Sequence, residues 1–591
     1  MNRRRPGLGT SSIIATLGAV LAAGTASAQE QSAQDRAAGG LSREQVNPAQ
    51  QAPTSRRQRP VDVFSGPARE GCTLSDDPAV AFLFKQAVIK DDAGILSEHE
   101  KQTVLADVIG RRITPRQLCE VRDRLAARIF KRGVLARVNI PTQTISGGVV
   151  TFHIFAARIM AVRVDGDVGP TQGKIETYLN HLRRRNTFNL DEVQRWLLLA
   201  NDLPGIQAVA AVVHSTAPGA PPGALDLVVT LRRTKVDETA LVANANAKTL
   251  GPWSGLVRVD LNSFTPLGEQ TSLVAYTTLG NFRQEVLQLT ESARVGGTGL
   301  YAQTSFSYGR ARPGNVLAPL DLTGNSYVGT IELDYPLARL QRQTLLVAGG
   351  MDFVNQDTRL PNAQALSDDA LRVIWARIAA SATATDRPWR GNLVSTTADL
   401  TVQGRKGLEA LGASEPAALG LSNSRGRADA WVVRAEGHAS IRVAPVNLRY
   451  LPVTLSAHFI GQWADRPLLG FEQQGIGNLT IGRGYDPSAA SGDEIIAGGL
   501  RAEVGPIRVG RRLQVSPYIF EDIARVSYLT PSQNDLTLRS LGGGLSVRVP
   551  YDARGNAVRI DAGYARPLDK AVPLARHKPP ELFLVQIIVT H

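Results

Sequence analysis

The hydrophobic and polar positions of the chain follow one pattern up to about residue 235 and a different one from there to residue 591. In the second part, apolar and polar side chains alternate along short stretches. In Leu256–Leu261, for example, Arg258 and Asp260 fall on one side of an extended chain, and Val257 and Val259 fall on the other. Because successive side chains of a strand point to opposite faces, this alternation predicts strands with one apolar and one polar face. A membrane-spanning β-barrel with a water-filled interior requires that arrangement.

The connections between these stretches also favour a barrel. Tight links alternate with longer polar stretches, and outer-membrane barrels have short turns at one end and long loops at the other. The tight links are Pro266–Glu269, Gly296–Gly299 and Pro550–Asn556, and the longer stretches are Arg310–Asn325, Asn355–Asp369 and Gly404–Arg427. At about 22 residues for each strand with its connection, residues 236–591 predict about 16 strands. A soluble array of β-sandwiches or a β-helix is the alternative, although sandwich domains of about 100 residues would be joined by linkers.

Between Cys72 and Arg233 the pattern is mixed, and it occurs twice. The clearest helix is predicted over Pro115–Lys131, where apolar residues recur every three or four positions from Leu118 to Ile129. Further helices are predicted at Ala79–Val88, His99–Ile109, Thr171–Arg184 and Leu190–Asn201, and strands at Leu135–Ile140, Val149–Phe155, Ile159–Val164, Ile206–His214 and Leu225–Arg232. These elements predict two small α+β modules in succession.

Residues 1–28 have the pattern of a secretory signal. Arginines at positions 3 to 5 precede a short apolar core, Ile13–Ala23, and Ala26-Ser27-Ala28 fits the small-residue pattern of a cleavage site. A spanning helix would need about 20 apolar residues, so we expect cleavage after Ala28 and export from the cytoplasm. Residues 29–66 are polar, and their composition taken alone favours a disordered tail.

Charge and motifs narrow the chemistry of the exported chain. There are 66 Lys and Arg against 53 Asp and Glu, a formal charge of +13. Basic runs such as Arg183–Arg185 and Arg511-Arg512 are expected to face water or lipopolysaccharide. Export of the chain argues against nucleic acid as a partner. The chain lacks a Gly-x-Ser-x-Gly elbow, a P-loop and a His-Glu-x-x-His motif. We therefore predict neither an enzyme nor a cofactor.

The cysteines and histidines give one structural prediction. Cys72 and Cys119 are the only two cysteines of an exported chain, and we expect them to form a disulfide that stabilises the first α+β module. The eight histidines are scattered along the sequence without ligand spacing, so no metal site is predicted.

The segment from Gly461 to Asp493 combines repeated glycines with a single arginine and an aromatic residue, in the order Gly482-Arg483-Gly484-Tyr485. The glycines allow a sharp turn and close packing, and a long arginine at the tip could reach a carboxylate inside a polar lumen. Asp522, in Phe520-Glu521-Asp522, is the candidate partner. An ordinary surface loop with a solvated arginine is the alternative.

These residues together resemble a known family. Arg483-Gly484-Tyr485, Gly492-Asp493 and Phe520-Glu521-Asp522 are similar to the loop-6 region of two-partner secretion transporters (TpsB), the ShlB/FhaC/HecB family, which is related to the BAM and TAM barrels. Cys72 and Cys119, with Arg132–Gln143 and Gly147-Gly148, resemble the first POTRA module of that family. Gly482 stands where family members usually have Val, and the last residue, His591, is not the usual aromatic.

The resemblance implies a domain order and a fold class. Residues 29–66 would form a plug helix and linker, which replaces the disordered-tail interpretation for Leu41–Gln50. Residues 67–155 would be POTRA1, 156–235 POTRA2 and 236–591 the barrel. The expected fold is therefore a pair of α+β POTRA modules followed by a transmembrane antiparallel β-barrel of about 16 strands.

The resemblance also implies a function. The protein would be an outer-membrane translocation pore with its POTRA modules in the periplasm, where they bind an unfolded secreted exoprotein such as a TpsA-like adhesin or haemolysin. Exposed sheet edges suit pairing with an extended client. Outer-membrane lipid and lipopolysaccharide are the other expected partners, and a monomer is expected. Two alternatives remain at this point, an assembly factor of the BAM or TAM kind, which would usually carry three or five POTRA modules, and a passive porin or adhesin barrel.

Overall fold

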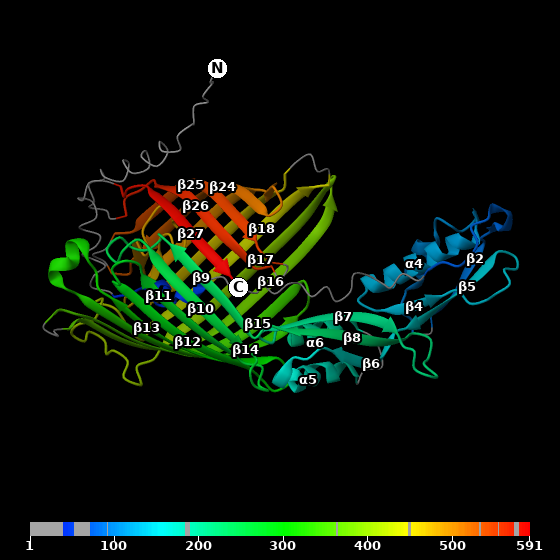
Figure 1. Cartoon of the computed structure of the whole chain (residues 1–591), viewed down its shortest axis with the longest axis horizontal. Coiled ribbons are helices and arrows are strands. Elements are labelled where there is room, and N and C mark those ends of the chain that lie inside the picture. Colours follow the sequence, from blue (N-terminus) through cyan, green and yellow to red (C-terminus); the bar gives the residue numbers. More distant parts are fainter. Residues whose placement is uncertain are drawn as a thin grey trace, which may run out of the picture.

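The computed structural model describes residues 40–51, 71–91, 93–183, 189–361, 365–446, 451–530, 534–552, 555–571 and 578–591. The predicted signal, 1–28, and most of the expected linker lie outside the described residues. A large β-barrel makes up the C-terminal part, and two small α/β units project from one of its ends, the first unit lying farthest from the barrel (Figure 1).

The barrel is closed and antiparallel, and its strands follow one another in sequence order. The strands are β9 (Val236–Ala243), β10 (Ser254–Asn262), β11 (Gln270–Thr278), β12 (Gln284–Val295), β13 (Leu300–Ala311), β14 (Thr323–Arg339), β15 (Gln343–Arg359), β16 (Ala365–Trp389), β17 (Asn392–Gly407), β18 (Trp431–Pro445), β19 (Val453–Ala464), β22 (Glu494–Val504), β23 (Ile507–Val509), β24 (Leu513–Ser527), β25 (Leu536–Pro550), β26 (Ala557–Pro567) and β27 (Leu582–Thr590). With β22 and the short β23 counted as one interrupted strand, the described chain has sixteen wall strands. The last strand pairs with the first from Gln586↔Ala243 to Thr590↔Thr239. The predicted fold class is confirmed.

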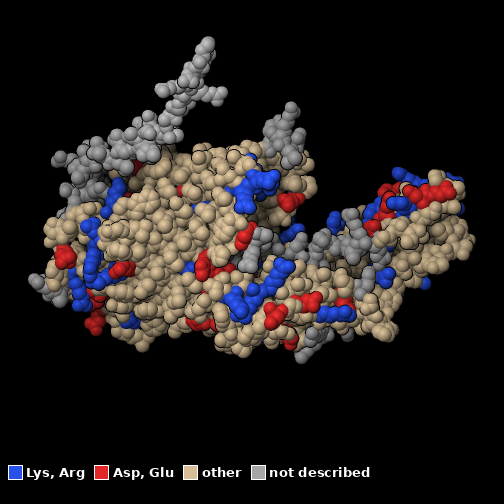
Figure 2. Space-filling model, viewed as in Figure 1, with Lys and Arg blue, Asp and Glu red and all other residues tan. Residues whose placement is uncertain are grey.

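Each wall strand has an apolar outer face and a more polar inner face. On β22, Ile496 and Leu500 are exposed on the outside, and on β24 the same holds for Ile519 and Ile523. A broad area of uncharged side chains covers the visible wall of the barrel (Figure 2). The amphipathic alternation in the sequence is therefore the pattern of a wall between lipid and an aqueous lumen.

The two N-terminal units repeat one topology. The first contains β1 (Phe82–Leu83), β2 (Gln86–Asp91), α3 (Glu98–Leu105), β3 (Arg112–Ile113), α4 (Pro115–Lys131), β4 (Ala136–Asn139) and β5 (Val149–Ala156), and the second contains β6 (Arg158–Asp165), α5 (Gln172–Arg183), α6 (Leu190–Asn201), β7 (Ile206–His214) and β8 (Ala224–Arg233). Their three-stranded sheets have the orders β2-β5-β4 and β6-β8-β7, each with a parallel pair first and an antiparallel pair second. No described helix is both long and apolar enough to cross a membrane.

Two local predictions are wrong. Ala79–Val88 is not helical, because β2 pairs in parallel with β5 from Gln86↔Val149 onward, and this tertiary pairing overrides local helix preference. Asn355–Asp369 is not a long loop, because β15 and β16 remain paired out to Arg359↔Ala365. Strand ends with water on both faces carry polar residues, as loops do, so polarity does not separate the two.

The first unit is held together by its helices and one disulfide. The predicted stripe of α4, including Leu118, Val121 and Leu125, is buried against the sheet. Cys72 and Cys119 are bonded, which ties the segment that enters the unit to α4. The fold therefore places this disulfide in the first unit, outside the barrel.

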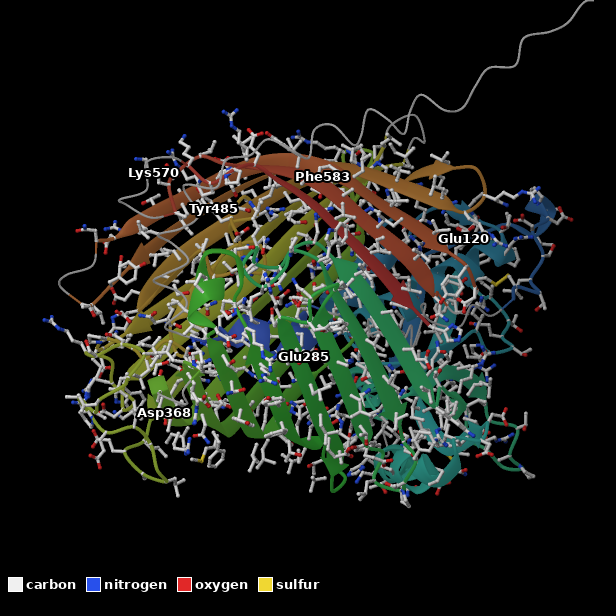
Figure 3. All side chains as sticks on the ribbon, turned by 60° about the vertical axis from the view of Figure 1, so that its left-hand side comes forward. Glu120, Glu285, Asp368, Tyr485, Lys570 and Phe583 are labelled. Atoms are coloured by element: carbon white, nitrogen blue, oxygen red, sulfur yellow. A yellow bond between two sulfur atoms is a disulfide. The ribbon has the colours of Figure 1, made fainter. Side chains whose placement is uncertain are left out.

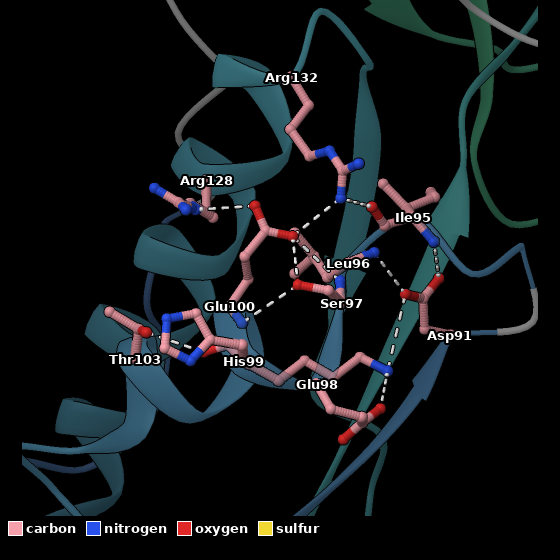
Figure 4. Close-up of polar contacts among 11 residues, drawn as sticks. Asp91, Ile95, Leu96, Ser97, Glu98, His99, Glu100, Thr103, Arg128 and Arg132 are labelled. Atoms are coloured by element: carbon pink, nitrogen blue, oxygen red, sulfur yellow. Dashed lines mark hydrogen bonds and ion pairs between the residues drawn. The ribbon is translucent and has the colours of Figure 1, made fainter.

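A polar cluster joins α3 to α4 (Figure 4). The Ser97 backbone N–H donates to Glu100, as does the Ser97 hydroxyl, and Arg128 and Arg132 contact the same carboxylate from α4. The two hydrogen bonds from Ser97, together with the arginines, lower the pKa of Glu100 below its usual value. Glu100 thus starts α3 with a capping box and also fixes the position of α3 on α4.

The second unit docks on the short turns of the barrel. Asp202, after α6, accepts two hydrogen bonds of 2.8 and 2.7 Å from Arg339 at the end of β14. Ser263, in the turn after β10, donates to the Pro204 carbonyl oxygen, and Thr171 donates to the carbonyl oxygen of Ser263. The end of the barrel with tight turns is therefore the end that carries the two units.

Candidate functional site

Two segments of the described chain that do not belong to the wall lie inside the barrel. The first is residues 40–51, with the short helix α2 (Arg43–Val46) and the 3₁₀ turn η1 (Pro48–Gln50). It is drawn in blue within the barrel in Figures 1 and 3. Leu41 and Val46 are buried against apolar side chains of the inner wall, such as Val286 and Val354.

Neutral hydrogen bonds hold this first segment. Its backbone carbonyl oxygens accept from three wall side chains, Leu41 from Gln356 at 2.7 Å, Val46 from Ser307 at 2.6 Å and Gln45 from Gln284 at 3.4 Å. The Nε and Nη2 atoms of Arg43 are buried without a hydrogen-bond partner among the described residues. The wall contacts of α2 are therefore uncharged hydrogen bonds. Its Glu44 also accepts a hydrogen bond of 2.9 Å from Gln474, in the connection between β19 and β22. The charge of Arg43 is offset only by nearby carboxylates such as Glu472, without hydrogen bonds at these two nitrogens.

The second segment is the connection between β19 and β22, residues 465–493, which folds inward rather than out from the rim. Its short strands β20 (Gln474–Ile476) and β21 (Ala490–Gly492) pair with each other. Its buried Glu472 binds two wall arginines, Arg405 at 2.5 Å and Arg434 at 2.9 Å. We call this segment the inward loop.

The tip of the inward loop carries Arg483, and the structure brings it to Asp522. Arg483 donates from Nε to Oδ2 at 3.0 Å and from Nη2 to Oδ1 at 2.6 Å, and its backbone N–H also donates to Oδ2 at 2.8 Å. The Arg483 guanidinium stacks 3.7 Å from the centre of the Phe520 ring. The Asp522 side chain is 2% exposed and that of Arg483 is 26% exposed. This bidentate, charge-assisted pair fixes both the position and the orientation of the tip.

The residues beside Arg483 lock the tip against the wall. Tyr485, labelled in Figure 3, is fully buried. Its hydroxyl donates to the Arg539 carbonyl oxygen at 2.8 Å and accepts from the Asp569 N–H at 3.1 Å. A Cβ atom on Gly484 would lie 2.7 Å from Ser540 Cβ, so only glycine fits there. Gly482 has a φ of +115°, a conformation that Val, the usual family residue, rarely adopts.

Two further residues of this site, Gly499 and Glu472, were not singled out from the sequence, and Asp493 was named only within the Gly492-Asp493 motif, without a role. Gly499 of β22 lies beneath the ion pair, and a Cβ atom there would be 2.8 Å from Asp522 Oδ1. Glu472 anchors the root of the loop, and the fully buried Asp493 accepts from the backbone N–H groups of Leu468 and Leu529. The pair of adjacent glycines in β22 could have indicated a close contact at Gly499. The partners of Glu472 and Asp493 depend on strand register, which the sequence does not reveal.

Known structures share this architecture. CdiB from Escherichia coli matches with a TM-score of 0.64 at 16% identity, over 96% of this chain and 100% of that chain. CdiB from Acinetobacter baumannii matches with a TM-score of 0.57 at 16% identity, over 95% and 96%. At this identity the likeness concerns the fold alone, and no curated protein matches significantly in sequence. The model of the haemolysin secretion/activation proteins ShlB/FhaC/HecB matches residues 223–549, more than half of the chain, and the protein therefore belongs to that family.

Proposed function

We propose that this outer-membrane secretion barrel binds an unfolded exported partner through its two N-terminal units, in the periplasm, and passes it through the lumen to the cell surface. The family consists of secretion transporters, not enzymes, and membership implies a secreted partner protein. Folding of the client outside the cell would give the passage its direction, so that no ATP site is needed. The barrel closes with its own strands, which supports a monomer in lipid.

The observation that carries this proposal is the weak seat of residues 40–51 in the lumen. A pore for a polypeptide must be closed at rest and open during export. Uncharged hydrogen bonds contribute only about 0.5–1.5 kcal/mol each, and Arg43 is incompletely compensated where it lies. The segment can therefore leave while the inward loop stays bound by its ion pairs.

The second unit offers a docking surface for an extended client. β7 is an edge strand of the sheet β6-β8-β7. Its Val209 and Val213 are 52% and 43% exposed, on the face of the sheet opposite the buried Ala208 and Ala210. An added strand could pair with backbone groups of β7 on the edge that faces away from β8, beyond Ala208, whose N–H donates to Asn201, and place alternate side chains beside these valines.

A disulfide that locks the segment tests displacement. A Cβ atom on Gly309 would lie 3.5 Å from Val46 Cγ2 and 2.9 Å from Leu41 Cδ1. The pair Val46→Cys and Gly309→Cys is therefore within reach of a bond once the end of the Leu41 side chain shifts, and the single variant Gly309→Cys controls for that shift. The oxidised double variant should fail to secrete the exported partner protein, and a reducing agent should restore secretion. The single variants and the parent protein, treated alike, control for reduction of Cys72–Cys119. Full secretion through protein shown by mass spectrometry to be cross-linked would refute the proposal.

Client recognition needs its own test. A photo-crosslinking amino acid at Val213 should capture the exported partner during secretion, whereas the same group at Gln102, exposed on α3, should capture far less. Equal capture at both positions would argue against β7 as the docking edge.

A further inference from the structure

Two histidines and two carboxylates meet on the inner wall of the barrel, across three neighbouring strands. Asp399↔His438 and His438↔His458 are directly opposite pairs in the registers of β17, β18 and β19. Glu436 precedes His438 by two positions and so lies on the same face of β18. That face is the inner one, because Arg434, two positions earlier again, binds the inward loop. The histidines are distant in sequence, which is why their spacing gave no sign of a site.

The side chains of this cluster lie at distances that suit metal ligands. His458 Nε2 is 3.2 Å from Glu436 Oε1, and His438 Nδ1 is 3.2 Å from Asp399 Oδ2. One ligand atom from each of Glu436, His438 and His458 lies within 4.8 Å of the other two. Ligand atoms about 2.1 Å from a tetrahedral zinc ion are about 3.4 Å apart. Side-chain rotation alone can therefore bring these three atoms to one ion.

The donor set selects a class of metal. Imidazole nitrogen with carboxylate oxygen suits Zn²⁺ and neighbouring divalent transition metals, whereas Mg²⁺ and Ca²⁺ prefer oxygen alone. The side chains of His438, Glu436 and His458 are 50%, 56% and 26% exposed, so an ion in the lumen water can reach them. The parallel rings, 4.0 Å apart and inclined by 11°, already place both imidazoles on one side of the lumen.

We propose that His438, His458 and Glu436 bind a divalent transition metal ion of the zinc class. Asp399 is the positioning residue, because an imidazole that donates its Nδ1 hydrogen to a carboxylate presents Nε2 to a metal. Three protein ligands leave a further coordination position open toward the lumen.

The site shares a cross-strand row with the tip of the inward loop. His458 is opposite Gly499, and Gly499 is opposite Asp522. A bound ion would thus add positive charge to the inner wall two strands from the Arg483–Asp522 pair. Zinc should therefore lower the cation current through the open pore.

Zinc binding to the full-length protein in detergent tests the proposal. The protein should carry no polyhistidine tag, and isothermal titration with Zn²⁺ alone should show one site. Co²⁺ in its place should give visible absorption bands of low-symmetry coordination. His438→Ala with His458→Ala should abolish both signals, whereas His99→Ala, which removes an exposed histidine on α3, should change neither.

Two further variants keep the test decisive if the double variant fails to assemble. Glu436→Gln, nearly isosteric, should reduce zinc affinity and alter the Co²⁺ spectrum. Asp399→Asn should weaken binding by about 10- to 100-fold, with recovery in Asp399→Glu and unchanged heat-modifiable mobility of the barrel. The proposal would be overturned if the parent protein bound no zinc. It would also be overturned if all of these variants bound zinc as tightly as the parent protein.

Discussion

The two segments inside the barrel differ in how they are held. Residues 40–51 make neutral hydrogen bonds to wall side chains such as Gln356 and Ser307. The inward loop, residues 465–493, makes buried ion pairs at its root, through Glu472, and at its tip, through Arg483. Both fill the same lumen, but the inward loop is bound to the wall by ion pairs, whereas residues 40–51 are bound to the wall by neutral hydrogen bonds and contact the inward loop through Glu44 and Gln474.

The difference in chemistry implies that the two segments differ in how easily they leave the lumen. A neutral hydrogen bond contributes about 0.5–1.5 kcal/mol, and one to a charged group about 1.5–3 kcal/mol. Breaking a buried ion pair by removing one partner costs about 3–5 kcal/mol, because the other charge is left uncompensated. The segment 40–51 is thus suited to leave and return, and the inward loop to remain as part of the wall.

The largest expected effect comes from breaking the anchor at the tip. Arg483→Ala leaves the buried Asp522 without its guanidinium and should destabilise the loop by about 3–5 kcal/mol. Secretion of the partner should be lost, and hydrogen–deuterium exchange should rise across residues 465–493 but not across the wall.

A matched control and a charge swap sharpen this prediction. Glu521 neighbours Asp522 but is exposed, on the opposite face of β24, so Glu521→Gln should leave secretion and exchange unchanged. Arg483→Asp combined with Asp522→Arg should recover part of the secretion lost in each single variant. A double variant that stays inactive while its barrel assembles normally would show that the pairing is not what export requires.

A smaller effect is expected at the root of the loop. Glu472→Gln removes the charge that Arg405 and Arg434 share, but Arg405 retains Asp352 at 2.9 Å. We expect a loss of about 1.5–3 kcal/mol, measured as faster hydrogen–deuterium exchange of the loop. Glu503→Gln, which loses an ion pair of β22 outside the loop, should not alter that exchange; equal acceleration in both would mean that Glu472 is not a specific anchor.

Two neighbouring glycines of β22 lie on opposite faces of the barrel wall, Gly499 on the inner face and Gly498 on the outer face. A Cβ atom on Gly499 would be 2.8 Å from Asp522 Oδ1, whereas one on Gly498, on the outer face, would meet only the His458 carbonyl oxygen at 3.9 Å. Gly499→Ala should therefore loosen the tip by about 1–3 kcal/mol, and Gly498→Ala should be tolerated. Comparable thermal stability and secretion in the two variants would remove Gly499 from the anchor.

The sequence predicted what depends on local periodicity. The helix at Pro115–Lys131 has the bounds expected from its apolar stripe, and the barrel strands follow their two-residue alternation. The pair Arg483 and Asp522 could be suggested because residue type and family resemblance both pointed to it. Contacts such as that between His438 and His458 depend instead on which strands are neighbours and in what register, and no local pattern encodes this.

The seat of α2 was beyond sequence reasoning for a related reason. Its partners, Gln284, Ser307 and Gln356, lie on three different strands and donate to backbone oxygens, so nothing in the side chains of residues 40–51 identifies them. Polar composition alone therefore could not distinguish a disordered tail from a segment bound in the lumen.

The smallest expected effect comes from removing one contact of residues 40–51. Gln356→Ala removes one neutral hydrogen bond to the Leu41 carbonyl oxygen, which should raise the fraction of open pores about 2- to 12-fold. Conductance in planar bilayers should show more frequent openings, while the unfolding temperature of the barrel stays the same. Gln303→Ala, four residues from Ser307 along β13, is the control and should not change the openings. If Gln356→Ala also leaves them unchanged, then the segment is held by its buried Leu41 and Val46 rather than by polar contacts, and displacement must begin by pulling those side chains from the wall.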